Sequence, residues 1–385
     1  MAALETLLSE AVAKDTLPFA VAMVGDSEGI EWSCCAGDAA KGQPAREDSV
    51  FRIFSMTKAI GSLAAMILID RDKLDFDTPV AEILPEFDRL KVIDRFDGDT
   101  AILRDPVRPA TVRHLATHTS GLEYEIWNAD MPRYMEATGL PSILSGSREG
   151  LFYPLMSDPG TRWAYGNGID WLGQVVEAVD GRSIDRFCRE EVFEPLAMTS
   201  TGFEPGQTKQ DRLVDSTIRG GDGSFEPFEI APPPNPEFYG MGHALYATAP
   251  DYLRFLRMLL NGGTLDGQTI LSRHGVERML ANHIGDLSLE KMVTVAPAVS
   301  ADVDIFPGTR KTHSFGFMRV EEDLPGQRSA GSQGWAGVLN THYWFDPHQD
   351  LAAVLMTQFL PFADPRFMQL YSDFETAVYA TYRSS

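Results

Sequence analysis

The chain has few cysteines, few basic residues and no long uninterrupted apolar run. Its three cysteines, the adjacent Cys34 and Cys35 and the distant Cys188, form neither a disulfide framework nor a metal-binding spacing. Lys and Arg number 33 against 55 Asp and Glu, which gives a formal charge of −22 and a surface that repels polyphosphates. These shortages exclude a disulfide scaffold and argue against a nucleic-acid partner.

The sequence also lacks targeting and membrane signals. The N-terminus, MAALETLLSEAVAKD, predicts an amphipathic helix and has neither the basic flank nor the apolar core of a secretory signal. The most apolar stretch, Ile53 to Ile69, contains Lys58 and several small polar residues, and it is too short and too polar for a membrane span. We therefore expect a cytoplasmic protein without a membrane partner.

The patterns that are present predict an α/β protein of the α+β kind. Helical stretches alternate with connections rich in Pro and Gly between about residues 74 and 239, and strand-like segments precede and follow them. Strands at both ends predict one antiparallel sheet flanked by helices, with an inserted helical lobe. We expect an α/β lobe from residues 1–73 and 284–385, and a mostly helical lobe from 74–283. The expected strands are 17–26, 30–38, 314–320, 337–346 and 350–359, and the last helix is 365–382.

Lys58 is the one charge in the apolar stretch and stands three residues after Ser55 in FRIFSMTKAIGSLAAMILID. Residues at this spacing share a helix face. A lysine surrounded by apolar residues loses some preference for its charged form, so it can accept a proton from the serine. The structural alternative is that Lys58 reaches the surface or pairs with a carboxylate. The pattern recurs in SLEK at Ser288, without an apolar helix behind it.

Two further segments carry polar groups suited to a cleft. Tyr165 and Asn167 lie in a glycine-flanked turn directly before a predicted helix, in DPGTRWAYGNGIDW. Taken alone, Tyr165 is better explained as a packed aromatic residue with a hydrogen-bonded hydroxyl. Small residues after Trp335, in GWAGVLNTHYWFDP, would let a substrate carbonyl approach the backbone N–H of Val338.

Taken together, these motifs resemble one family. Ser55-Met-Thr-Lys before an apolar helix, HLATHTSGL (114–122), PGTRWAYGN (159–167), ATAPDYLRFLRMLLNGG and GWAGVLNTHYWFDP are similar to motifs of the penicillin-recognising, class C β-lactamase-like serine enzymes, and most closely of their family VIII carboxylesterases. The resemblance covers most of the chain. It implies a β-lactamase/transpeptidase-like fold with the site between sheet and helical lobe.

The resemblance also implies residue roles. Ser55 would be the nucleophile, Lys58 and Tyr165 would share the proton transfer, and Asn167 would help to hold the lysine and the acyl group. The oxyanion hole would use the N–H groups of Ser55 and Val338. No cofactor is implied. We expect a serine carboxylesterase that hydrolyses small-molecule esters with short to medium acyl chains through an acyl-enzyme on Ser55.

The substrate is indicated by a departure from the lactamase pattern. Enzymes that bind β-lactams carry Lys-Thr-Gly where this chain has Trp335, Ala336 and Gly337, and an indole cannot bind a carboxylate through charge. β-Lactam, amide or D-peptide hydrolysis and acyl transfer on the same site stay open as alternatives, as does a catalytically silent penicillin-binding-like sensor. The oligomeric state is left open as well.

Several residues have competing interpretations. Tyr124 and Trp127, which follow the HTSGL turn, either wall the substrate pocket or pack in the core, and the same holds for Phe238 to Gly240. His114 and His118 have a spacing that suits metal ligands, but neither an acid between them nor a third ligand nearby supports a metal site. We therefore expect no metal. Ser332 lies in a Gly-x-Ser-x-Gly-like segment that precedes a strand and not the helix that a nucleophile elbow needs.

Overall fold

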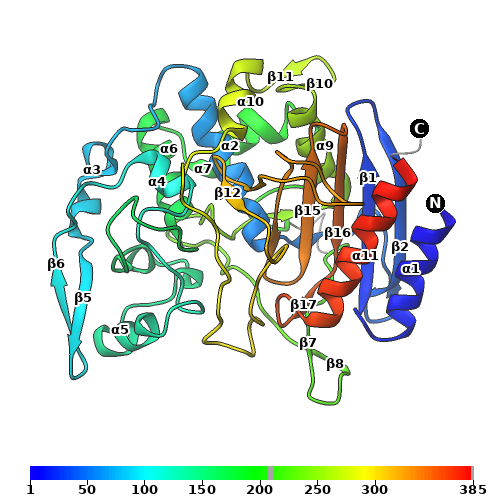
Figure 1. Ribbon diagram of the computed structural model, residues 1–385, viewed down its shortest axis with the longest axis horizontal. Coiled ribbons are helices and arrows are strands. Elements are labelled where there is room, and N and C mark those ends of the chain that lie inside the picture. Colours follow the sequence, from blue (N-terminus) through cyan, green and yellow to red (C-terminus); the bar gives the residue numbers. More distant parts are fainter. Residues whose placement is uncertain (207–210, 383–385) are drawn as a thin grey trace.

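An eight-stranded antiparallel sheet is built from both ends of the chain in the computed structural model, which describes residues 1–206 and 211–382 (Figure 1). Its strand order is β12-β13-β14-β15-β16-β1-β2-β3, so the C-terminal strands pair with the N-terminal one. The strands are β1 (Phe19–Gly25), β2 (Ile30–Ala40), β3 (Gln43–Pro44), β12 (Lys311–His313), β13 (Met318–Val320), β14 (Gln333–Gly337), β15 (Thr341–Asp346) and β16 (Leu351–Met356). The predicted antiparallel sheet, completed by the C-terminus, is confirmed.

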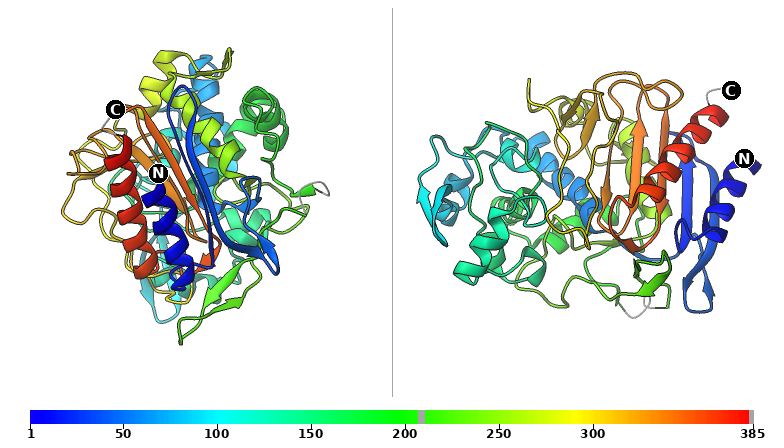
Figure 2. Two further views of the ribbon diagram at one scale, coloured as in Figure 1. Left: turned by 90° about the vertical axis from the view of Figure 1, so that its right-hand side faces the viewer. Right: turned by 60° about the horizontal axis from the view of Figure 1, so that its bottom comes forward.

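Both faces of the central strand β1 are buried, and because side chains alternate along a strand, its residues divide between two cores. In β1, Ala20, Ala22 and Val24 pack in the core beneath the terminal helices, while Val21 and Met23 face the larger core. Figure 2 shows α1 (Ala2–Ala13) and α11 (Pro365–Tyr382) side by side over one face.

The opposite face carries α2 (Thr57–Asp70) and α9 (Ala249–Leu260), and beyond α2 lies the helical part of the molecule. Every residue of α2 from Thr57 to Ile69 is buried, as expected for a helix that has protein on all sides. Further helices in the described part of the chain are α3 (Val80–Ile83), α4 (Val112–Ala116), α5 (Asp130–Thr138), α6 (Gly168–Asp180), α7 (Ile184–Cys188) and α10 (Arg273–Leu280). Short 3₁₀ turns are η1 (Phe54–Met56), η2 (Pro85–Arg89), η3 (Ile143–Ser145) and η4 (Arg148–Leu151), and η5 (Arg189–Phe193) is a π turn.

The region expected to be a helical lobe departs from that expectation in two respects. It contains β5 (Val92–Asp97) and β6 (Thr100–Arg104), which form a hairpin around a glycine at φ 54°. Helix α9 packs on β1 and β16, so the expected boundary at residue 283 does not match this packing. The physical reason is its apolar face, which contacts the sheet while Arg257 donates to the carbonyl of Asp26 beside β1.

Short strand pairs complete the fold. They are β4 (Phe51–Arg52) with β9 (Tyr246–Ala247), β10 (Thr264–Leu265) with β11 (Gln268–Thr269), and β17 (Phe359–Leu360) with β7 (Thr217–Arg219) and β8 (Phe225–Pro227). Residues 207–210 of the expected helical lobe and 383–385 of the expected α/β lobe lie outside the described residues. In the described part of the chain, no helix has the length and apolar character needed to cross a membrane.

Candidate active site

Ser55 lies in the 3₁₀ turn η1, immediately before the main helix α2. The strand β4, which pairs with β9, lies just before this turn in the chain. Phe54 has φ 40°, a left-handed conformation that is an outlier for a bulky residue and marks a sharply constrained turn. The turn therefore holds Ser55 at the N-terminal end of α2, where free backbone N–H groups and the helix dipole favour negative charge.

Lys58 is on the first turn of α2 and is only 2 % exposed. Its Nζ donates to Oγ of Ser55 at 3.1 Å and to the carbonyl oxygen of Gly242 at 2.8 Å. Nζ also lies 4.8 Å from the ring centre of Tyr165 and 5.1 Å from that of Tyr124. The Ser-x-x-Lys spacing thus brings the two side chains into contact, as expected, and Lys58 does not reach the surface.

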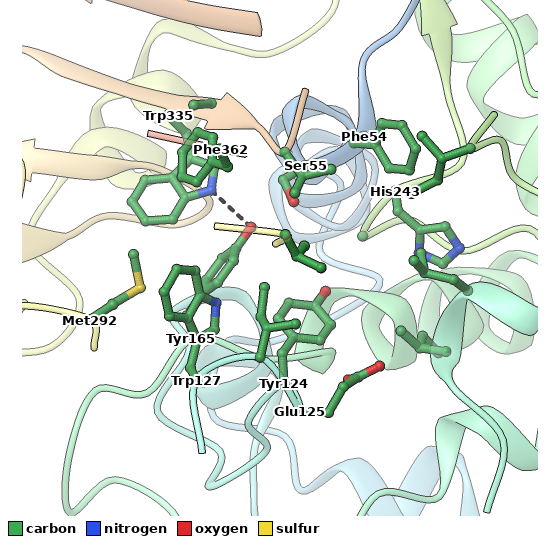
Figure 3. Close-up of a pocket in the computed structure, with 18 residues that line it drawn as sticks. Phe54, Ser55, Tyr124, Glu125, Trp127, Tyr165, His243, Met292, Trp335 and Phe362 are labelled. Atoms are coloured by element: carbon green, nitrogen blue, oxygen red, sulfur yellow. Dashed lines mark hydrogen bonds between the residues drawn. The ribbon is translucent and has the colours of Figure 1, made fainter. Parts of the chain in front are cut away.

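Tyr165 shares a hydrogen bond with a residue from the other side of the site. Nε1 of Trp335 donates to Oη of Tyr165 at 3.0 Å, and the two rings are 5.0 Å apart (Figure 3). Trp335 lies on β14, whose neighbour β13 pairs only with Gln333 and Gly334. The rest of β14 pairs with β15 alone, so its other edge faces Ser55 and Tyr165.

The end of β14 lies directly against the turn that carries the serine. A Cβ atom at Gly337 would be 2.3 Å from the carbonyl oxygen of Ile53 and 2.4 Å from Oγ1 of Thr341. Only glycine permits this approach. It brings Val338 to the wall of the same cavity as Ser55. Asn340, at φ 63°, fixes the following turn with side-chain hydrogen bonds to Phe359, Pro361 and Ala363.

Asn167 is fully buried, but its observed partner differs from the expected one. Its Nδ2 donates to the carbonyl of Leu151 at 3.3 Å, whereas the backbone carbonyl of Gly242 accepts from Lys58. Gly242 is itself held by Asp170, because its N–H donates to Oδ1 of that carboxylate at 2.9 Å. The structure therefore supports Lys58 through Gly242 and Asp170, and Asn167 supports the loop behind them.

A mostly apolar cavity of about 110 Å³ opens beside Ser55. Since one water needs roughly 10–15 Å³ by this measure, the space suits several waters or a short acyl chain. Tyr124 and Trp127 line this cavity, which fits their interpretation as pocket-wall residues. Phe238 and Tyr239 do not line the cavity. Gly242 and His243, a few residues further along the chain, line it instead. The cavity is lined by Phe54, Ser55, Tyr124, Glu125, Ile126, Trp127, Ile143, Leu144, Tyr165, Ile230, Gly242, His243, Met292, Val299, Trp335, Ala336, Val338 and Phe362.

Neutral groups lie beside Lys58 and Tyr165. Burial lowers the pKa of His118 well below its ordinary value, and the nearby His313 and Lys58 add to this effect. Burial likewise lowers the pKa of His313 to about 3. Burial raises the pKa of Tyr124 well above its ordinary value, with a further contribution from the Asp170 carboxylate. Both imidazoles and the Tyr124 phenol are therefore uncharged at neutral pH.

The other candidate residues raised by the sequence lie outside the site chemistry. Nδ1 of His114 accepts from the backbone N–H of Thr111 in a capping box, and Nδ1 of His118 accepts from Gly166. Ser288 is exposed, and Lys291 pairs with Asp302 instead. Ser332 is fully buried just before β14 and is inaccessible to a substrate.

Asp170, Gly242 and His243 are site residues that the sequence reasoning missed. Asp170 is on α6, three residues after Asn167, and Nδ1 of His243 is 3.3 Å from its Oδ1. The only available signal was the glycine pair in FYGMGHA, which permits a close backbone approach. The pairing itself joins residues more than 70 positions apart and has no local pattern.

Comparisons with known proteins agree with this geometry. The family model "Beta-lactamase" matches residues 4–377. The lovastatin esterase of Penicillium rubens is 30% identical over 366 residues, which cover 88% of this chain and 87% of the relative. The monacolin J acid methylbutanoyltransferase of Aspergillus terreus is 28% identical over 401 residues, 99% of this chain and 96% of the relative.

Solved structures extend the comparison to the fold. Unliganded simvastatin synthase (LovD) from Aspergillus terreus has a TM-score of 0.88 at 27% identity, covering 100% of this chain and 99% of that one. EstCE1, described as a hydrolase with promiscuous acyltransferase activity, has a TM-score of 0.76 at 22% identity over 97% of both chains, a likeness of fold alone. With its serine and lysine in contact at the end of α2, this chain belongs to the beta-lactamase family, among the serine hydrolases and acyltransferases that share its fold.

Proposed function

We propose that this protein is a serine carboxylesterase of the family VIII kind, acting on small-molecule esters with short to medium acyl chains. The observation that carries the proposal is the contact of Ser55 Oγ with Lys58 Nζ in a largely apolar cavity whose Lys-Thr-Gly position is taken by Trp335. An apolar cavity binds a hydrocarbon chain through desolvation. A neutral indole offers one N–H donor, which Tyr165 already accepts.

In the proposed acylation step, Ser55 Oγ attacks the ester carbonyl carbon as its proton passes to Lys58 or Tyr165. The carbonyl oxygen becomes an oxyanion, held by the N–H groups of Ser55 and Val338, each of which contributes about 3 kcal/mol to stabilising the transition state. The C–O bond to the alcohol then breaks, and the alcohol leaves with the proton that Ser55 gave up. The acyl group stays on Ser55.

Deacylation reverses these steps with water as the nucleophile. Water gives its proton to the Tyr165 and Lys58 pair, its oxygen bonds to the acyl carbon, and Ser55 leaves with a proton regained from the pair. Asp170 acts on this chemistry through Gly242, whose carbonyl fixes the position of Lys58 Nζ. Asn167 acts more remotely, by holding the loop at Leu151.

Acyl transfer is the second candidate, because the cavity lining favours an organic acceptor as much as water. An alcohol oxygen in place of water would give a new ester by the same proton movements. Relatives named as a methylbutanoyltransferase and as an esterase match this chain to a similar extent. β-Lactam hydrolysis is less favoured, since Trp335 brings no cation to a drug carboxylate. A silent sensor is less favoured because Lys58 keeps its contact with Ser55.

The test is the initial rate of p-nitrophenyl butyrate hydrolysis by the parent protein and Ser55→Ala. We expect activity in the parent and a loss of at least 10⁴-fold in the variant, since no other group supplies the nucleophile. Ser288→Ala is the matched control, because it removes an exposed serine with the same spacing to a lysine, and it should keep the parent rate.

Added 1-butanol distinguishes the two candidates. With an esterase, the amount of butyrate formed per p-nitrophenol released is the same with and without butanol. With an acyltransferase, butyl butyrate forms in place of part of the butyrate. Hydrolysis that survives Ser55→Ala would contradict the mechanism. A parent protein inactive on every p-nitrophenyl ester, but labelled at Ser55 by a fluorophosphonate, would contradict the carboxylesterase assignment alone.

A further inference from the structure

Met292 lies between two hollows of the protein. It lines the cavity that contains Ser55, and it also lines a smaller hollow of about 20 Å³, which has room for one or two waters by the same measure. Trp335 lines both spaces as well. Met292 and Trp335 therefore form a partition between the cavity and the smaller hollow.

The smaller hollow is suited to a hydrocarbon group. The charged residues at its edge are exposed, as Glu290 is, or already paired. Nζ of Lys311 lies 3.3 Å from Oδ1 of Asp304 and donates to the carbonyl oxygen of Phe306 at 3.0 Å. The apolar side chains that line the hollow are Trp163, Leu289, Met292, Val303, Ile305, Met318 and Trp335.

The backbone of Met292 is fixed, whereas its side chain is adaptable. The N–H of Met292 donates to the carbonyl oxygen of Val303, and the N–H of Val303 donates to that of Met292, each at 2.9 Å. The side chain is only partly buried. An unbranched thioether adjusts its shape to the groups beside it. A substitution at this position therefore changes the partition while the backbone bridge to Val303 stays in place.

The partition lies on the side of Ser55 that carries the phenol. Figure 3 shows Tyr165, Trp335 and Met292 on one side of Ser55 and Phe54 on the other, and Trp335 donates to the oxygen of Tyr165. In the proposed mechanism the leaving alcohol takes its proton from the lysine and tyrosine pair, so its oxygen must come within hydrogen-bond reach of that pair. The alcohol portion of the ester therefore extends toward Met292, and the acyl portion extends toward Phe54.

We propose that Met292 determines the length of the alcohol portion that the enzyme accepts. The inference rests on the proposed ester chemistry and specifies its substrate class: esters of short alcohols, whose chain ends against the Met292 side chain. Without that side chain, the cavity joins the smaller hollow and admits a longer alcohol. One methylene group more or less in an apolar pocket changes kcat/KM by about 10- to 200-fold.

The experiment varies the two portions of the ester separately. The alcohol series is ethyl, butyl and hexyl butyrate, and the acyl series is p-nitrophenyl acetate, butyrate and hexanoate. The measured quantities are two ratios of kcat/KM, hexyl over ethyl and hexanoate over acetate, because a ratio cancels general damage to the enzyme. In Met292→Ala we expect the hexyl-over-ethyl ratio to rise at least tenfold and the hexanoate-over-acetate ratio to change less than threefold.

Three further variants assign the effect to the partition. Met292→Leu fills nearly the same space and should keep the hexyl-over-ethyl ratio within threefold of the parent. Ile230→Ala removes a lining residue that packs against the apolar cluster of Phe54, so it should change the acyl ratio and not the alcohol ratio. Met368→Ala removes a partly buried methionine of α11, on the other face of the sheet, and should leave both ratios as in the parent.

The outcomes separate the two proposals. An unchanged hexyl-over-ethyl ratio in folded Met292→Ala, or an equal rise of the acyl ratio, would overturn the role of Met292 while leaving the esterase intact. If no ester of either series is hydrolysed, the carboxylesterase proposal fails. Met292 is then tested by calorimetric binding of ethyl and hexyl butyrate to Ser55→Ala with and without Met292→Ala. A relative affinity for the hexyl ester that rises at least tenfold supports its role, and an unchanged one overturns it.

Discussion

Trp335 places an N–H donor on the Tyr165 oxygen that the proposed mechanism uses for proton transfer. A donor at this atom orients the phenol. An ammonium at the same position would do this as well, but it would also attract anionic substrates. The indole therefore separates the positioning of Tyr165 from the attraction of a carboxylate, which agrees with the preference for neutral esters proposed above.

Trp335→Phe tests the contribution of the single hydrogen bond from Trp335 to Tyr165. The change keeps an aromatic ring against Tyr165 but removes the donor, which costs about 1–3 kcal/mol when the partner is buried. We expect kcat/KM for p-nitrophenyl butyrate to fall roughly 10- to 100-fold.

Trp163→Phe is the matched control for this measurement. Trp163 stacks near the same phenol, with ring centres 6.3 Å apart, but its buried Nε1 has no hydrogen-bond partner among the described residues. Its replacement should change the rate less than threefold. Equal losses in the two variants would show that the ring, and not the N–H group, supports Tyr165.

At the scale of elements, the end of β14 packs tightly against the turn η1. Gly337 lies against the carbonyl of Ile53 with no room for a side chain. This contact fixes the distance between the two proposed oxyanion donors, which come from different elements. Movement of either element by an ångström misplaces one donor.

Gly337→Ala is expected to separate the two elements. The added methyl group must displace backbone atoms, so kcat for p-nitrophenyl butyrate should fall at least 100-fold, the magnitude typical for loss of one oxyanion donor. Gly221→Ala is the control, because a Cβ atom there meets nothing within 4 Å and the residue has no left-handed φ. An unchanged kcat in Gly337→Ala would refute the oxyanion role of Val338.

The elements also show what sequence patterns can predict. Helices α1, α2, α6 and α11 and the strands on both sides of β1 were predicted, because apolar periodicity and turn residues are local signals. The hairpin of β5 and β6 was missed, since it lies among segments with helical patterns. The contact of Ser55 with Lys58 was predictable from a spacing of three residues on a helix.

Contacts between distant segments could not be predicted in this way. Gly242 accepts from Lys58 across 184 positions, and the meeting of Asp170 with His243 depends on how α6 packs beside the Gly240–His243 turn. The expectation for Asn167 came from family likeness, and the observed hydrogen bond to Leu151 depends on the local course of the backbone. Such contacts depend on tertiary packing, for which the sequence has no periodic pattern.

For the whole molecule, buried histidines couple folding to pH. Burial lowers the pKa of His313 and His342 to about 3, that of His114 and His283 to about 4, and that of His118 well below its ordinary value of 6.5. Between these values and about 6.5 the unfolded chain binds protons that the folded chain does not. Stability is therefore fully present above about pH 6.5 and falls as the pH drops below it.

We expect the free energy of unfolding to decrease by about 7 kcal/mol per pH unit below pH 6, since each of these five histidines contributes roughly 1.4 kcal/mol. Urea unfolding at pH 8, 7, 6 and 5 measures this slope. His342→Gln should reduce it by about one fifth, whereas the exposed His274→Gln should not change it. Equal stability at pH 5 and pH 7 would contradict the prediction.

The strand order has a consequence for how the enzyme is made. Ser55 and Lys58 are synthesised early, but Trp335 and Val338 come late, and β14 reaches the site only through β15 and β16, which dock on β1. While a ribosome is still translating the middle of the chain, the serine and lysine are already present without the second proposed oxyanion donor or the partner of Tyr165. Catalytic competence therefore arises only when translation has passed β16, so a stalled or truncated chain cannot acylate itself with esters from the cell.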